Sequence, residues 1–255
     1  MKKLTVTLFT LLSLSACRQQ DSELTSASTT KTPIVQASAD STATPQVATC
    51  QVNAPLLPAP DQPNADSELA AYLQKLQQAV KAHSTGELKE LLSPDIRTGF
   101  DGSGGWSSFT KQWNPEDAHS EVWLLLEHMT RLGGDYPVEN NQDLYALPYV
   151  YSSWPDSLDA FTHIAVTNPS TILRQEPAAN APAACTLSQV ILKADPNKSY
   201  PLDKQQKEWW HVQTADGELQ GYLYHTDVYS PVGYRAIFSK NKQGQWQMTA
   251  LVAGD

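Results

Sequence analysis

The sequence predicts an α+β protein in which a mainly helical amino-terminal domain is followed by strands. Between residues 66 and 134 apolar side chains recur every three or four positions, which is the spacing of amphipathic helices. Beyond residue 134 β-branched and aromatic residues gather or alternate with polar ones between turn signals, as strands require. All seven tryptophans lie beyond residue 65, so the folded body is expected to begin near Asp66.

The chain begins with a predicted export signal at residues 1–16. Lys2 and Lys3 precede an apolar run that ends at Leu14 and is too short to span a bilayer. The run Leu14-Ser15-Ala16-Cys17 is similar to the lipobox of bacterial lipoproteins. The resemblance implies that Cys17 is acylated, with palmitate among its chains, and holds the mature protein on a lipid bilayer. Cleavage of the Ala-x-Ala type would instead leave Cys17 an ordinary thiol.

The residue after the cysteine bears on the location. Arg18 stands where aspartate is the usual signal for inner-membrane retention. The resemblance therefore implies a cell-envelope lipoprotein of the outer membrane that faces the periplasm, if the cell is Gram-negative.

Loss of residues 1–16 removes two lysines and changes the formal charge from −9 to −11, which disfavours nucleic acid as a partner.

Residues 17–65 are rich in Ser, Thr, Ala and Pro and contain no aromatic residue, so they predict a disordered tether. Cys50 lies within this tether and Cys185 lies far downstream. Because two thiols exported to an oxidising compartment are usually joined, we expect a disulfide between them. The alternative is two unrelated buried thiols.

Four helices are expected in the first domain, residues 66–166. The first begins at Asp66 or Ser67, and the second has a capping box of Ser84 and Glu87 and is stopped by Pro94. The third follows a glycine-rich loop and the fourth runs from Asn114-Pro115 to Gly133-Gly134. Their apolar stripes contain Leu69, Tyr72, Leu73, Leu76 and Val80; Leu88, Leu91 and Leu92; Trp106, Phe109 and Trp113; and Val122, Leu125, Leu126, Met129 and Leu132.

The remainder of the first domain, at residues 144–156 and 160–166, predicts extended segments. Residues 231–255 predict a β-hairpin with its turn at residues 241–244. We expect this hairpin to pair with the extended segments around Tyr145 to Val166.

A second hairpin is expected between Glu208 and Val228, with its turn at Asp216-Gly217. Because neighbouring residues of a strand point to opposite faces, Trp210 and Val212 are expected in the core. Trp209 would then lie among polar neighbours and remain partly open to solvent.

Residues 167–230 resemble the bacterial SH3 (SH3b) domain. The similar pieces are Leu173-Arg174 and Glu176-Pro177, Leu187 with 190–192, 209–212, Asp216-Gly217, 221–223 and Asp227-Val228. The sequence departs from the family where Glu176 replaces a glycine and Tyr222 a tryptophan. The resemblance implies a small SH3-like β-barrel that binds a peptide, peptidoglycan or an envelope protein, or that serves as a spacer. The aromatic residues that could line its groove are Trp209, Tyr222, Tyr224 and Tyr229, which could equally pack the barrel or a domain contact.

No catalytic, metal or cofactor motif accompanies these elements. The six histidines show no zinc-ligand spacing, and each cysteine has a more economical role than catalysis. Four carboxylates flank the glycine-rich loop, and turn or cap roles suit them better than acid–base chemistry: Asp95, Asp101, Glu116 and Asp117. The sequence therefore favours a tethered envelope binding protein without a cofactor. A cell-wall hydrolase with a carboxylate site in the helical domain is the alternative.

Overall fold

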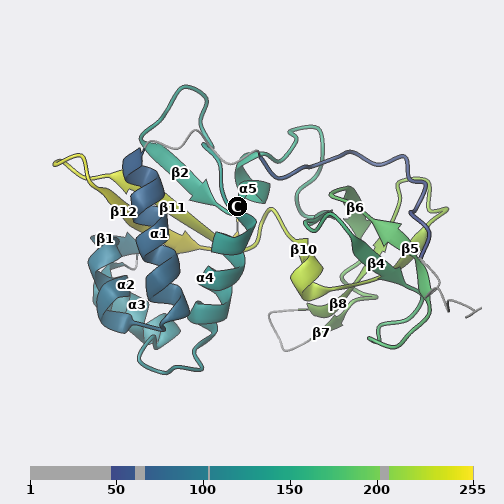
Figure 1. The fold of residues 1–255 in the computed structure, drawn as a ribbon, viewed down its shortest axis with the longest axis horizontal. Helices are drawn as coiled ribbons and strands as arrows, with labels where there is room; N and C mark the ends of the chain where they lie inside the picture. Colours follow the sequence, from purple (N-terminus) through teal and green to yellow (C-terminus); the bar gives the residue numbers. More distant parts are fainter. Residues whose placement is uncertain (1–46, 61–66, 103, 202–206, 255) are drawn as a thin grey trace, which may run out of the picture. The chain divides into compact units, whose positions relative to one another are not determined.

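In a computed structural model of the chain, the described residues are 47–60, 67–102, 104–201 and 207–254. The predicted signal peptide, Cys17 and most of the predicted tether lie outside them. The described residues form an α+β fold with a four-stranded sheet and an eight-stranded sheet (Figure 1). The α+β class predicted from the sequence is thus confirmed.

The five described helices are α1 (Ser67–Lys81), α2 (Thr85–Leu91), α3 (Gly105–Trp113), α4 (Glu121–Leu132) and α5 (Tyr149–Ser152). The Ser84 hydroxyl caps α2 by accepting a hydrogen bond from the Glu87 amide. Helix α4 begins later than predicted. Asn114 takes a left-handed conformation that ends α3, and Ser120 becomes the residue that caps α4.

The four-stranded sheet has the order β1-β12-β11-β2. Its strands are β1 (Leu92–Arg97), β2 (Leu144–Leu147), β11 (Arg235–Lys240) and β12 (Trp246–Val252). Strand β11 pairs antiparallel with both β12 and β2, so the carboxy-terminal hairpin joins the segment around Tyr145 as expected. Strand β1 was not expected, since Pro94 indicated only a helix end. It pairs parallel with β12 at the sheet edge, where proline is tolerated.

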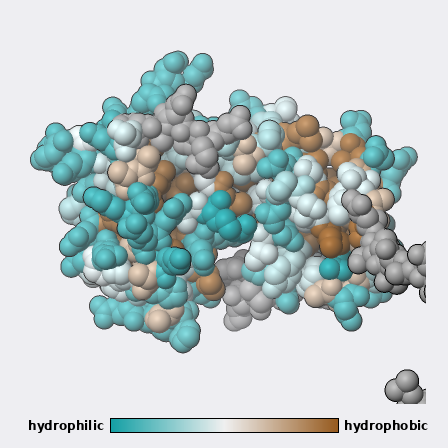
Figure 2. All heavy atoms as spheres, in the orientation of Figure 1, coloured by the Kyte–Doolittle hydropathy of each residue, from teal (hydrophilic) through white to brown (hydrophobic). Residues whose placement is uncertain are grey.

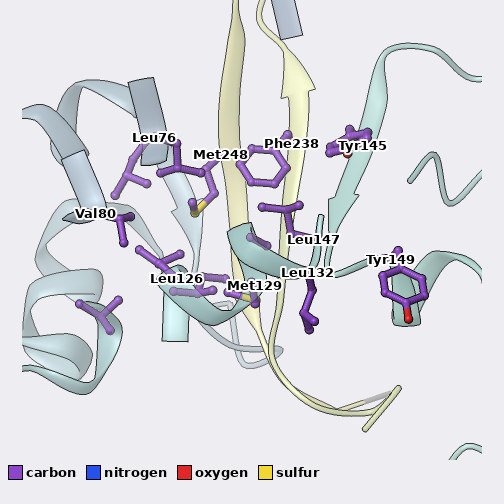
Figure 3. Close-up of a cluster of buried hydrophobic side chains, with 14 of the residues drawn as sticks. Leu76, Val80, Leu126, Met129, Leu132, Tyr145, Leu147, Tyr149, Phe238 and Met248 are labelled. Atoms are coloured by element: carbon purple, nitrogen blue, oxygen red, sulfur yellow. The ribbon is translucent and has the colours of Figure 1, made fainter. Parts of the chain in front are cut away.

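The apolar stripes of α1 and α4 pack onto one face of this sheet. Leu76 and Val80 from α1, Leu126 and Met129 from α4, and Phe238 of β11 belong to one apolar cluster, which Figure 3 shows. The Tyr72 ring of α1 meets the Phe238 ring edge-on at 5.7 Å. The opposite side of α1 is polar, and Figure 2 shows mainly hydrophilic residues over α1 and α2.

The eight-stranded sheet has the order β10-β3-β6-β8-β9-β4-β5, with β7 paired to β8. Its strands are β3 (His163–Val166), β4 (Thr171–Arg174), β5 (Ala183–Leu187), β6 (Ile191–Ala194), β7 (Tyr200–Pro201), β8 (Lys207–Gln213), β9 (Gln220–Tyr224) and β10 (Val228–Tyr229), with a short 3-10 helix at His225–Asp227. Among the described residues this sheet is open, so the closed barrel predicted from the sequence is not observed. Strand β3, expected to pair with the carboxy-terminal hairpin, pairs with β10 and β6 instead.

Residues 47–60 differ from the unstructured tether that their composition predicts. Cys50 is bonded to Cys185 across 135 positions, which confirms the predicted disulfide. The segment also forms isolated bridges through Thr49 and Leu56, and Leu57 is buried in the core beneath the helices. A covalent bond and a few apolar side chains therefore hold this segment on the folded body.

A candidate aromatic binding face

Strands β8 and β9 form the hairpin predicted from the Asp-Gly signal. Gly217 takes the positive φ of 75° that the turn requires. The Asp216 carboxylate accepts hydrogen bonds from the Thr214 hydroxyl and the Glu218 amide. These bonds, the hydroxyl first, lower the pKa of the Asp216 carboxyl. The turn fixes a register in which Trp209 lies opposite Tyr224.

That register divides the hairpin into two faces. On one face Val212 and Leu223 belong to an apolar core that is formed mainly by side chains of the eight-stranded sheet, and Trp210 packs against this core. On the other face the Trp209 ring lies 5.1 Å from the Tyr224 ring, and the His211 ring lies 5.1 Å from Tyr222.

The second face continues past the end of β9. The Tyr224 ring contacts the His225 ring at 4.5 Å. The five ring residues Trp209, His211, Tyr222, Tyr224 and His225 therefore lie together, and we call them the aromatic face. None of them belongs to either apolar core of the described residues.

The exposure predicted for the two neighbouring tryptophans is wrong. Trp209 is only 7% exposed, whereas Trp210 is half-buried. Alternation assigned the side chains to faces correctly, but the second face is not open to water. The Tyr224 ring covers Trp209 from β9, and β7 pairs with β8 beside it. Trp210 packs against its core only in part.

His211 is the polar member at the base of the aromatic face. It is 5% exposed, and its Nδ1 atom has no hydrogen-bond partner among the described residues. Burial lowers the pKa of His211, the nearby Lys198 lowers it further, and Asp195 opposes both. The imidazole is therefore neutral near pH 7 and can donate one hydrogen bond and accept another.

His225 lies at the other end of the face, where the charged groups that act on it are carboxylates. Burial lowers its pKa, and the carboxylates of Glu208 and Asp227 oppose that shift. Carboxylates thus lie beside both histidines, and Lys198, which pairs with Asp195 at 3.8 Å, lies beside His211 as well. The charged side chains around the aromatic face are therefore of both signs.

Tyr229, predicted to line a groove with the other aromatic residues, lies elsewhere. Its ring meets the His128 ring of α4 at 5.4 Å, and its hydroxyl donates a hydrogen bond to the Tyr234 carbonyl. Tyr229 belongs to the core beneath the helices, and burial raises its pKa. Burial also lowers the pKa of His128 to about 4, with Arg131 and His225 contributing in the same direction. Tyr229 therefore has the packing role that the sequence left open.

The carboxylates near the glycine-rich loop do not form a buried pair. Asp95, Asp101 and Glu116 are exposed, and the exposed Asp117 carboxylate accepts a hydrogen bond from the His119 amide. The described residues contain no group of three or more His, Cys, Asp or Glu side chains placed to hold a metal ion. In the same part of the chain, no helix combines the length and apolar character needed to cross a bilayer.

Comparison with known proteins does not assign this chain to a family. No protein-family model matches the chain, and no curated protein matches it. Sequence reasoning found Trp209, Tyr222 and Tyr224 but not the two histidines. The register set by the Asp-Gly turn could have indicated His211, because it lies opposite Tyr222.

Proposed function

We propose that this chain is a cell-envelope lipoprotein whose aromatic face binds an extended peptide or the peptide-bearing polymer of the cell wall. The observation that carries the proposal is that five ring side chains lie together outside both apolar cores. Large rings that do not fill a core are commonly used to recognise ligands.

The members of the face divide into a support and a contact surface. Trp209 and His211 are buried and hold the base, whereas Tyr222, Tyr224 and His225 are half-buried. The exposed parts of those three rings supply apolar area together with hydroxyl and imidazole groups.

The secondary structure supports an SH3b-like identity for residues 167–230. Apart from Glu176-Pro177, which follows β4, the similar sequence pieces lie wholly or partly on β4, β5, β6, β8, β9 and β10, and the Asp-Gly piece forms the turn between β8 and β9. In this proposal the aromatic face is the ligand groove of that domain. The groove contains His211 and His225, and it does not contain Tyr229.

The lipid anchor supplies the cellular context of the binding site. Acylation of Cys17 places the protein on the periplasmic side of the outer membrane, in a Gram-negative cell, with the folded body held by the intervening chain. The formal charge of −11 after loss of residues 1–16 makes nucleic acid an unfavourable partner. The ligand is therefore sought among cell-wall polymers and envelope proteins.

Cosedimentation with purified peptidoglycan tests the proposal. The mature chain carrying Cys17→Ser is compared with a Tyr222→Ala/Tyr224→Ala variant and with Phe161→Ala, an aromatic residue that is 64% exposed and is not a member of the aromatic face. We expect the double variant to bind at least tenfold more weakly, because it removes two ring contacts worth about 1 kcal/mol or more each. The Phe161→Ala control should bind as the parent does.

Two results would count against this function. Unchanged binding by the double variant would remove the aromatic face as the binding site. A fall in turbidity of the cell-wall suspension would show hydrolysis and support the alternative function, whereas binding at constant turbidity agrees with the proposal.

A further inference from the structure

The face of the four-stranded sheet opposite the helices carries a cavity of about 270 Å³. Ala236 and Phe238 of β11 belong to the core beneath the helices. Arg235 and Ile237 alternate with them and line the cavity on the other face. The cavity is thus separate from the core and lies in another part of the fold than the aromatic face.

Arg235 is the buried cation of this cavity, with 8% of the residue exposed. Its guanidinium lies 4.5 Å from the centre of the Tyr151 ring and 5.9 Å from the centre of the Phe100 ring. It donates a hydrogen bond to the Gly254 carbonyl. Among the described residues no carboxylate forms an ion pair with Arg235.

These contacts satisfy the guanidinium only in part. Arginine has five N–H donors, and burying its charge costs several kcal/mol unless an anion and hydrogen bonds compensate. Two aromatic rings stabilise the charge, and one carbonyl takes a hydrogen bond. Donors therefore remain for a further acceptor on the cavity side.

A second arginine reinforces the positive charge. Arg97 of β1 is exposed and lines the same cavity. None of the described lining residues is acidic, although the chain has 27 acidic and 18 basic side chains. The remaining wall is mainly apolar and includes Phe100, Val138 and Ile237. Phe100 and Val138 are 65% and 47% exposed, so the apolar wall continues to the surface.

We propose that this cavity binds a small organic carboxylate. The carboxylate accepts hydrogen bonds from Arg235 and Arg97, because a planar guanidinium matches two carboxylate oxygens. The apolar part of the ligand lies against Phe100, Val138 and Ile237. This site does not depend on the aromatic face, which lies on the eight-stranded sheet.

Titration with benzoate tests the proposal, with benzamide as its neutral counterpart and acetate as the anion without an apolar part. Two-dimensional NMR spectra of the mature Cys17→Ser chain are recorded in a carboxylate-free buffer. We expect saturable shifts for benzoate that include the Tyr151 and Phe100 rings. The dissociation constants of benzamide and acetate should be at least tenfold higher.

Charge variants locate the binding. Arg97→Gln changes an exposed side chain and should weaken benzoate binding at least tenfold, while Lys81→Gln, an exposed change on α1, should leave it unchanged. Arg235→Lys keeps the buried charge but loses the planar donor pair, so it should also weaken binding. Three results would overturn the proposal: no saturable benzoate binding, equal binding of benzamide, or full benzoate affinity in both arginine variants.

Discussion

Trp209 gives the sharpest stability prediction, because the sequence and the structure place it differently. The residue is 7% exposed and belongs to neither apolar core, and its ring packs against the Tyr224 ring at 5.1 Å. Truncation of a buried tryptophan to alanine costs about 3–5 kcal/mol. We therefore expect Trp209→Ala to destabilise the protein by that amount.

The melting temperature converts this free energy into a measurement. For a folded body of this size, 1 kcal/mol corresponds to about 2–4 °C, so Trp209→Ala should lower the Tm by about 6–20 °C. Trp210→Ala should lower it less, since Trp210 is half-buried at the margin of its core. Differential scanning calorimetry of both variants shows which substitution lowers the Tm more.

A double-mutant cycle isolates the ring contact. Trp209→Ala and Tyr224→Ala should be less than additive by about 0.5–1.5 kcal/mol, the range for aromatic pairs. Phe161→Ala is the exposed control and should change stability by less than about 0.5 kcal/mol. If Trp209→Ala melts within the range of this control, or if Trp210→Ala is the more damaging change, the burial argument fails.

The remaining predictions concern the cysteines and one histidine. Thiol titration of the denatured, unreduced protein should find no free thiol at Cys50 or Cys185, and two free thiols would refute the bond. Replacing both cysteines with serine should lower the free energy of unfolding by up to about 5 kcal/mol, because the bond closes a loop of 135 positions. Cys17→Ser should abolish detergent partitioning, and labelled fatty acid in that variant would contradict acylation at Cys17. Burial lowers the pKa of His128 to about 4, so its neutral form contributes stability above pH 6.5 that is lost as the pH falls from 6.5 to 4. This loss reaches about 3 kcal/mol, and urea titrations across that range should show a smaller loss for His128→Gln; equal losses would argue against the shift.

The helices were predictable because their signals are local. The stripe from Leu69 to Val80 and the Ser84 cap depend on residues a few positions apart, and the structure contains α1 and α2 there. Strand β1 was missed because its evidence is distant in sequence. Leu92 to Arg97 becomes a strand through pairing with β12, more than 150 positions away, and no local pattern signals that partner.

The candidate site shows the same limit at the level of single residues. Alternation places Trp209 and Trp210 on opposite faces, but exposure depends on what covers each face, and the Tyr224 ring that covers Trp209 comes from β9. Arg235 is a stronger case. Its neighbours Ala236 and Phe238 assign it to the outer face of a hairpin, where a charged side chain is ordinarily solvated. Only the fold brings Tyr151 and Phe100 onto its guanidinium.

Trp209 and Arg235 are both buried, and neither burial is explained by an apolar core. Each residue projects from a strand whose other face does supply a core, through Val212 beside Trp209 and through Phe238 beside Arg235. Packing of the core face keeps the strand rigid, so the side chain on the outer face is held in place without contributing to that core. It follows that a core-face substitution should lower stability together with the binding activity on the same sheet. Substitutions at exposed positions of the two sites, such as Arg97, should reduce one binding activity while the fold and the other activity persist.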